Sequence, residues 1–230
     1  MTLETLLRDD GRILFIGNSL VFSAGGVNNA FEALARSAGR LVVQSAETVG
    51  GYCLRQHLER PQTMAALTSG SWDVVVLHDY SNGPIKDREG FFKAGAALAE
   101  IARTHGAKPV LYMTWAYRED YDGMTVAGGA MTRALAQAYS ALGAKIGAPV
   151  APAGLAFQNA LDKGIDLYSD LRHQNEAGTY LVACVFYGFL FGRSPVGLPF
   201  THGLSQSGAA VLQQIAWQTL SGETEGAGAP

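Results

Sequence analysis

The sequence has little cysteine: Cys53 and Cys184 are the only two in 230 residues. They form no Cys-x-x-Cys pair, and two cysteines are too few for the disulfide framework of a small secreted domain. Cys184 lies in the apolar run YLVACVFYGFLFG, where a free thiol usually serves as a small core side chain. We therefore expect no disulfide bond.

Long apolar segments are also missing. The run from Tyr180 to Gly192 is too short to span a bilayer and is interrupted by glycine, so it predicts a buried helix. The N-terminal segment MTLETLLRDDGR has neither the basic start nor the apolar stretch of a secretory signal. The cytoplasm is the expected location by default, and a secreted form after removal of a signal peptide is the open alternative.

Neither sign of charge predominates in the sequence. Seventeen basic and twenty acidic residues leave a formal net charge of −3, and the basic residues are scattered along the chain. Proteins that bind nucleic acid or an anionic membrane gather positive charge in a patch or stripe. The sequence therefore favours neither nucleic acid nor a membrane as a partner.

Motifs for metals and nucleotides are absent from the sequence. There is no HxH or HExxH spacing, and the glycine-rich stretches GNSLVFSAGG and TVGG match neither GxGxxG nor GxxxxGK[ST]. We therefore expect no metal and no cofactor. Three histidines, His57, His105 and His202, are predicted to lie on the surface.

Short apolar stretches and helical segments alternate along the chain. Five stretches rich in Val, Ile or Leu predict strands: RILFIG, LVVQSAE, DVVVLHD, KPVLYMTW and APVAPAG. Helices are predicted at residues 28–38, 90–104, 127–144, 175–191 and 205–220. The pattern predicts the α/β class, as a three-layer α/β/α sandwich with a central, mainly parallel sheet of about five strands.

The length of the chain fits a single domain. With 48% hydrophobic residues it can bury a sizeable core, and no linker divides it. We expect one domain over residues 1–220 and a flexible, glycine-rich tail over residues 221–230.

Polar residues follow the predicted strands, at the sheet edge where α/β proteins place their ligands. Ser19 follows the first strand, Gly50 and Gly51 follow the second, and the segment HDYSNGP follows the third. Asp170 and His173 stand in YSDLRHQNEAG, just before the long C-terminal helix. We expect these residues to meet at one edge.

The residue types at this edge suit catalysis by a serine nucleophile. A serine hydroxyl needs an imidazole to accept its proton, and the imidazole needs a third group to orient it. Ser19, His173 and Asp170 can fill these roles. In the alternative interpretation Ser19 caps a helix, His173 caps the last helix or bonds a carbonyl, and Asp170 is a charge at a helix N-terminus. Only a triad explains all three together.

The order of these blocks resembles the SGNH hydrolase family, the GDSL-type esterases and lipases. The family's first block, Gly-Asp-Ser, is matched by Gly17, Asn18 and Ser19, with Asn in place of Asp. Its last block, Asp-x-x-His, is matched by Asp170 and His173. The resemblance implies a flavodoxin-like fold and a serine ester hydrolase that works through a covalent acyl-enzyme.

The middle blocks match the family less closely. A glycine after the second strand is matched by Gly51, with the preceding glycine as the alternative, and the family's Gly-x-Asn-Asp is replaced by YSNG with Asn82. Because the flanking Gly and Asp are absent, His78 or Asp79 is the alternative for the third position. The resemblance implies an oxyanion hole formed by Ser19, Gly51 and Asn82.

The predicted loops favour a small, polar ester as substrate. They are rich in aromatic and polar residues and contain no long apolar lid, which suits an acetyl group carried by a carbohydrate or another polar alcohol. Candidates for the substrate wall, each also a common core or rim residue, are Tyr52, His78, Tyr80, Trp115 and Tyr117. A thioesterase or acyltransferase of the same family, and a non-catalytic carbohydrate-binding protein on this scaffold, are the alternatives.

Overall fold

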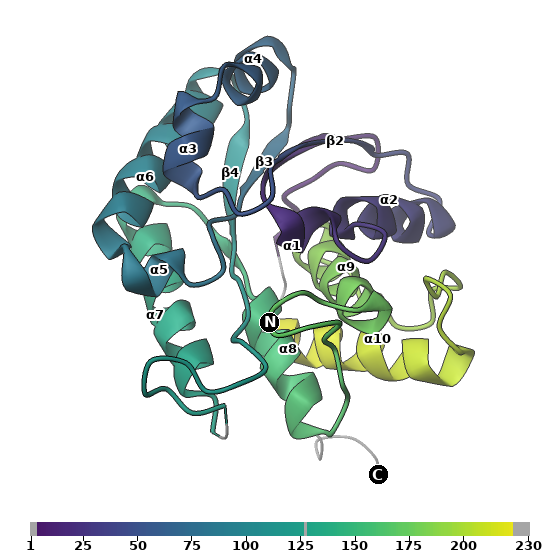
Figure 1. Ribbon diagram of the computed structural model, residues 1–230. Coiled ribbons are helices and arrows are strands. Elements are labelled where there is room, and N and C mark those ends of the chain that lie inside the picture. The colour runs from purple at the N-terminus through teal and green to yellow at the C-terminus, as the bar shows by residue number, and fades with distance from the viewer. Residues whose placement is uncertain (1–3, 127, 223–230) are drawn as a thin grey trace.

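A five-stranded parallel sheet forms the centre of the molecule in the computed structural model, which describes residues 4–126 and 128–222 (Figure 1). Its strand order is β2-β1-β3-β4-β5, and every neighbouring pair is parallel. The strands are β1 (Arg12–Gly17), β2 (Val43–Thr48), β3 (Val74–Leu77), β4 (Lys108–Tyr112) and β5 (Val150–Ala151). The predicted α/β class and parallel sheet are confirmed.

The central strands are apolar on both sides. All of β3 is buried, and in β1 only Arg12 is exposed. The edge strand β2, with the sequence VQSAET, has no fully buried residue. This distribution is typical of a parallel sheet covered on both faces, where a central strand meets a helix layer on each side.

Helices cover both faces of the sheet (Figure 1). One layer consists of α1 (Ser19–Phe22), α2 (Val27–Ser37), α8 (Ala153–Asp162), α9 (Glu176–Phe191) and α10 (Gln206–Ser221). The other consists of α3 (Leu54–Glu59), α4 (Pro61–Ser69), α5 (Gly83–Lys86), α6 (Arg88–Thr104) and α7 (Ala130–Ile146). No helix was predicted at α1, α3, α4, α5 or α8, because these helices are short and lack a long apolar period.

The helix α9 fills the centre of its layer. It is buried along almost its whole length, and Phe186 packs edge-on against Phe15 of β1 with ring centroids 5.4 Å apart. Cys184 is buried in the same helix as a free thiol, and Cys53 is also free. Within the described residues no helix is long and apolar enough to cross a membrane.

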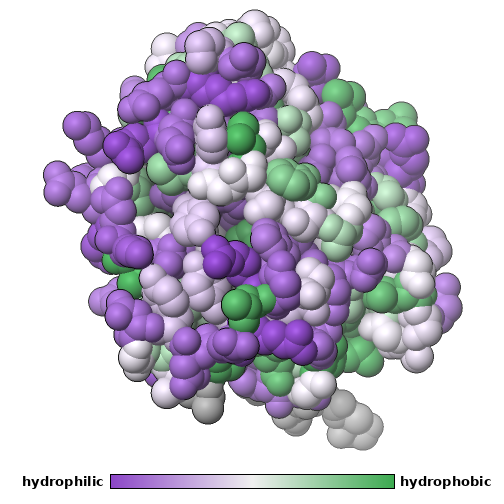
Figure 2. All heavy atoms as spheres, viewed as in Figure 1, coloured by the Kyte–Doolittle hydropathy of each residue, from purple (hydrophilic) through white to green (hydrophobic). Residues whose placement is uncertain are grey.

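The surface is mostly polar on the face shown in Figure 2, where hydrophobic side chains are scattered among hydrophilic ones. The predicted tail at residues 221–230 lies almost entirely outside the described residues.

Candidate active site

A small cavity lies at the carboxyl ends of the first three strands. Its volume is about 160 Å³, and we call it the Ser19 cavity; its lining residues are Asn18, Ser19, Leu20, Gly51, Tyr80, Ser81, Arg172 and His173. The chain reaches it from the ends of β1, β2 and β3 and from the loop before α9. The four sequence blocks therefore meet at the predicted edge.

Ser19, His173 and Asp170 form a continuous chain of hydrogen bonds. His173 Nε2 lies 2.8 Å from Ser19 Oγ, and His173 Nδ1 lies 2.7 Å from Asp170 Oδ2. An ionised carboxylate only accepts hydrogen bonds, so Nδ1 carries the imidazole proton and Nε2 is left to accept from the serine hydroxyl. This tautomer is the one that a general base requires.

The carboxylate of Asp170 is held in its ionised form. Its Oδ1 accepts the backbone N–H groups of Arg172 at 2.8 Å and His173 at 2.7 Å. Partial desolvation raises the pKa of Asp170, but these backbone hydrogen bonds and the imidazole of His173 outweigh it and lower the pKa to about 2. The charge that orients His173 is therefore present at neutral pH.

The loop before α9 is closed by local hydrogen bonds that place His173. The backbone N–H of Ser169 donates to the carbonyl of His173 at 2.9 Å, and Asn175 caps α9 by accepting from Gly178 N–H at 3.0 Å. Gln174 reaches across to α1, where its Nε2 donates to the carbonyl of Leu20 at 3.1 Å. Gln174 thus couples the His173 loop to the helix that carries Ser19, a role that the sequence analysis missed.

Asn18, and not Ser19, caps the helix α1. The Oδ1 atom of Asn18 accepts from Leu20 N–H at 3.2 Å, and Ser19 is the first residue of the helix. The longer helix α2 begins after Gly26, which makes no side-chain cap. The capping alternative for Ser19 is therefore wrong, and its hydroxyl is bonded to His173 instead.

The side chain of Asn18 joins the loops that follow the first three strands. Its Nδ2 donates to the carbonyl of Tyr52 at 3.0 Å and to that of Asp79 at 3.1 Å, while its Oδ1 also lies 3.1 Å from Nε2 of His78. A carboxylate could not donate to the two carbonyls. This network explains why asparagine stands here in the place of the family's aspartate.

His78 does not belong to the substrate wall, and that prediction is wrong. The side chain is fully buried, donates to Asn18, and packs 4.6 Å from the ring of Tyr112. Burial lowers its pKa to about 3, so the ring is neutral. A Cβ atom on Gly17 would lie only 2.8 Å from the His78 ring, so this packing also requires the glycine of the first block.

His57 is buried, which corrects the prediction that it lies on the surface. Its Nε2 lies 2.7 Å from the carbonyl of Gly17, so Nε2 donates and Nδ1 accepts from Thr63 Oγ1 at 3.0 Å. Desolvation by burial lowers the pKa of His57. The short helix α3 turns His57 beneath the end of β1, where it fixes the backbone just before Ser19.

Gly51 is the glycine of the second strand's loop that lines the Ser19 cavity, whereas Gly50 does not. Gly51 has φ +75° and stands third in a turn closed by the Tyr52 N–H bonding the Val49 carbonyl at 3.2 Å. This conformation favours glycine. Within the described part of the chain, the backbone N–H of Gly51 has no protein acceptor.

Asn82 is not part of the Ser19 cavity, contrary to its predicted place in the oxyanion hole. Its side-chain amide donates to the hydroxyl of Tyr121 at 2.7 Å, and the residue is 6% exposed. The two alternatives are also occupied, because His78 donates to Asn18 and the Asp79 carboxylate is an acceptor. In the loop after β3, Tyr80 lines the Ser19 cavity and Asn82 does not.

A second cavity of about 410 Å³ adjoins the first, with which it shares Gly51, Tyr80 and Arg172. We call it the tyrosine cavity; its other lining residues are Cys53, Gln56, Asn82, Gly83, Lys86, Asp87, Tyr117 and Tyr121. Tyr80 and Tyr117 therefore lie where a substrate wall was predicted.

Two other wall candidates lie outside both cavities. Trp115 is 1% exposed, stacks on Phe157 with centroids 4.4 Å apart, and donates from Nε1 to the carbonyl of Arg172 at 2.9 Å. It is a core residue, so its predicted contact with substrate is wrong. Tyr52 is half-buried with its ring beside His57, and its carbonyl serves the Asn18 network.

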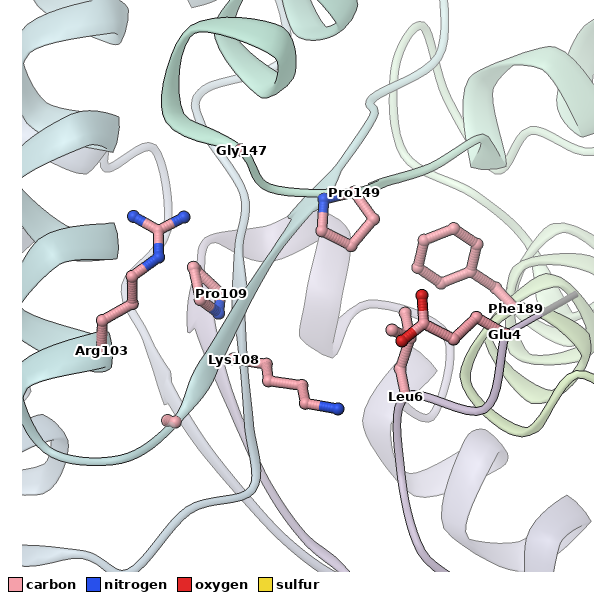
Figure 3. A pocket seen from close by; sticks show the side chains of 9 residues that line it. Glu4, Leu6, Arg103, Lys108, Pro109, Gly147, Pro149 and Phe189 are labelled. Carbon is pink, nitrogen blue, oxygen red and sulfur yellow. The ribbon is translucent and has the colours of Figure 1, made fainter.

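A larger cavity is remote from this chemistry. It has a volume of about 540 Å³ and lies at the amino end of the sheet, where Lys108 and Pro109 begin β4 and Pro149 precedes β5 (Figure 3). Leu6 and Phe189 give it an apolar wall, and it contains neither a serine nor a histidine. Within the described ranges, no cluster of His, Cys, Asp and Glu side chains could hold a metal ion.

Solved structures with the same fold include several hydrolases. A candidate SGNH hydrolase from Slackia heliotrinireducens is 29% identical, with a TM-score of 0.65 over 79% of this chain and 99% of that chain. A DUF4886 family protein from Bacteroides uniformis is 19% identical, with a TM-score of 0.76 over 94% of this chain and 97% of that chain. No family model matches the sequence, and no curated protein matches it.

A third structure, a variant of an acetyl xylan esterase from Geobacillus stearothermophilus, is 15% identical, with a TM-score of 0.64 over 87% of this chain and 99% of that chain. At such identity the likeness shows the fold alone. The fold, the order of the sequence blocks and the 29% identical structure make the chain similar to the SGNH-type hydrolases. These similarities support an enzyme of the SGNH/GDSL hydrolase class.

Proposed function

We propose that the protein is a serine ester hydrolase with Ser19 as nucleophile, His173 as general base and acid, and Asp170 as the group that orients the imidazole. The observation that supports this proposal best is the hydrogen-bonded chain from Ser19 Oγ through His173 to Asp170, with distances of 2.8 and 2.7 Å. Its geometry is within the range in which a base can take the proton of a nucleophile.

The reaction takes place in two halves. Ser19 Oγ attacks the ester carbonyl carbon while His173 Nε2 takes the hydroxyl proton, and a tetrahedral intermediate forms. The bond to the alcohol then breaks as His173 returns the proton to the leaving oxygen. A water molecule, deprotonated by His173, attacks the acyl-enzyme, and its collapse releases the acid and restores the serine.

The oxyanion of the intermediate meets backbone donors at the cavity. The N–H of Ser19 belongs to the first turn of α1, where amides have no intrahelical acceptor, and the N–H of Gly51 has no protein acceptor in the described structure. Backbone donors that already point into the cavity before the reaction stabilise the negative charge that develops in the transition state.

The two cavities suggest how the substrate divides between acyl group and alcohol. The Ser19 cavity, at about 160 Å³, is less than half the size of the adjoining tyrosine cavity, at about 410 Å³, and its small size suits an acetyl group. The tyrosine cavity presents Tyr117 and Tyr121 together with the charged side chains of Lys86 and Asp87. Aromatic faces beside polar groups suit a sugar, so we propose an acetylated carbohydrate or similar polar alcohol as substrate.

The test compares Ser19→Ala with a matched serine variant. With p-nitrophenyl acetate, Ser19→Ala should lose on the order of 10⁶ in kcat, since this is the scale of losing a triad serine. Ser37→Ala removes a hydroxyl that bonds the Leu34 carbonyl at 2.7 Å and should retain full activity. A fluorophosphonate should label the wild type and Ser37→Ala but not Ser19→Ala.

Chain length and alcohol are tested separately. The wild type should hydrolyse p-nitrophenyl acetate far faster than the octanoate, and should release acetate from acetylated xylo-oligosaccharides. Near-wild-type turnover by pure Ser19→Ala would refute the proposed nucleophile. Equal rates on acetate and octanoate esters would refute only the proposed small acyl group.

A further inference from the structure

Tyr80 lines the Ser19 cavity from the loop that follows β3. It is the residue after β3 whose side chain could face the reacting atoms, since it lines the same cavity as Ser19 and His173. The neighbouring hydroxyl of Ser81 is engaged with the hydroxyl of Tyr117 at 2.9 Å. The amide of Asn82 is engaged with Tyr121.

The hydroxyl of Tyr80 has a hydrogen to donate. Arg172 Nη1 lies 2.7 Å from this hydroxyl, and a guanidinium group has donors only. The phenolic oxygen is therefore the acceptor in this bond, and its own hydrogen is directed elsewhere. Within the described residues the hydroxyl has no second hydrogen-bond partner, so a negative oxygen in the cavity would complete its hydrogen bonding.

Arg172 is held firmly enough to position that hydroxyl. Its backbone N–H donates to the Asp170 carboxylate at 2.8 Å, and its carbonyl accepts from the buried Trp115 at 2.9 Å. Its guanidinium carbon lies 5.2 Å from the ring centroid of Tyr117. The carboxylate that orients His173 therefore also fixes the backbone of Arg172.

We propose that the Tyr80 hydroxyl is the third donor of the oxyanion hole, beside the backbone N–H groups of Ser19 and Gly51, and that Arg172 is its positioning residue. This inference rests on the proposed function. A hydroxyl that accepts a hydrogen bond from a cation is polarised and donates more strongly to an anion. The Tyr80 hydroxyl, polarised by Arg172, thus takes the donor role that the family gives to a carboxamide.

Tyr80→Phe tests the donor because it deletes one oxygen atom and keeps the ring. On p-nitrophenyl acetate we expect kcat to fall about 10² to 10³, the usual loss for one oxyanion donor, with little change in KM. Affinity for a boronic acid that forms a tetrahedral anion on Ser19 should fall by a similar factor. Tyr187→Phe is the matched control, since its hydroxyl accepts from Arg40 Nε at 3.3 Å outside both cavities, and it should keep wild-type kinetics.

A double-mutant cycle tests the role of Arg172. Arg172→Met should lower kcat in the wild type but cost much less in the Tyr80→Phe background, because it acts through the lost hydroxyl. Equal costs in both backgrounds would overturn the positioning role.

A folded Tyr80→Phe variant with wild-type kcat would overturn the role of the Tyr80 hydroxyl as donor. So would a loss of about 10² in kcat in Asn82→Ala with no such loss in Tyr80→Phe. If Ser19→Ala is inactive in either case, the proposed function stands and only this inference fails. Turnover by Ser19→Ala would remove the proposed function and this inference together.

Discussion

Asn18→Asp is the most informative single substitution, because the family block would tolerate it and the structure forbids it. Aspartate is the family's residue at this position, so the resemblance alone predicts a neutral change. In the structure, Asn18 is 2% exposed and its Nδ2 donates to the carbonyls of Tyr52 and Asp79. A carboxylate at this place would face both oxygens with no hydrogen to give.

The magnitude follows from the two lost donors. The buried carbonyl of Asp79 left without its partner costs about 1–3 kcal/mol, and the part-buried carbonyl of Tyr52 adds a smaller cost, before any charge repulsion. Burial and the facing carbonyls would raise the pKa of the new carboxyl, since both disfavour its charged form. The mutant's folded state would then bind a proton more tightly than its unfolded state, so its stability deficit should grow as pH rises.

Urea unfolding of the wild type and of Asn18→Asp between pH 5 and pH 8 measures this deficit. The matched control is Asn29→Asp, an exposed asparagine whose Nδ2 donates one hydrogen bond to the Gly25 carbonyl at 2.9 Å. Exposed substitutions usually change stability by about 0.5 kcal/mol or less. Because Asn18 also orders the cavity loops, hydrolysis should fall in parallel.

The reasoning would be refuted if Asn18→Asp unfolded at the urea concentration of the wild type at pH 8. If the stability deficit were the same at pH 5 and pH 8, the lost hydrogen bonds would still explain it, but the buried charge would not contribute.

Two further substitutions test the electrostatics of the carboxyl groups. Asp170→Asn should lower kcat by up to about 10⁴, as in a serine protease triad, because the amide no longer fixes the imidazole tautomer; steady-state kinetics check this, and wild-type kcat would mean that another group orients His173. Burial raises the pKa of Asp79 from 3.8 to about 6, despite hydrogen bonds from the backbone N–H groups of Tyr80 and Leu54. The folded state therefore binds the Asp79 proton more tightly than the unfolded state does. About 3 kcal/mol of folding free energy, present in full below pH 4, should be lost as the pH rises through 6. Urea unfolding at several pH values should show this slope in the wild type and lack it in Asp79→Asn; identical slopes would contradict the assignment.

The parallel sheet and the order of the blocks are properties of the sequence itself. The run VVVL in β3 has no polar alternation and is rich in β-branched residues, which predicts a strand covered on both sides. Asp170 and His173 are three residues apart, and a short turn is enough to join their side chains. Local spacing and hydrophobic pattern are therefore sufficient to predict the fold class and the residues of the proposed triad.

The partners of the remaining site residues come from elements far apart in the chain, so only the tertiary structure shows them. Nothing local distinguishes Asn82, bound to Tyr121, from an oxyanion donor, because that contact spans 39 residues. The bond between Arg172 and Tyr80 spans 92 residues and likewise leaves no periodic signal. Trp115 is typical of a cavity wall by composition, yet the packing of α8 beneath it makes it core.

The burial of His57 and His78 also follows from tertiary packing rather than from the local sequence. His57 lies in the short helix α3 and His78 directly follows β3, and the sequence around each favours exposure or a polar site. Tertiary packing instead places both against Gly17 or Asn18, where a neutral imidazole can donate to a backbone carbonyl or an amide oxygen. The sequence determines which residue types reach the sheet edge, because strand order and local turns carry them there. Which of them faces the cavity is decided only when the three loops close on one another, because each buried donor must then find an acceptor.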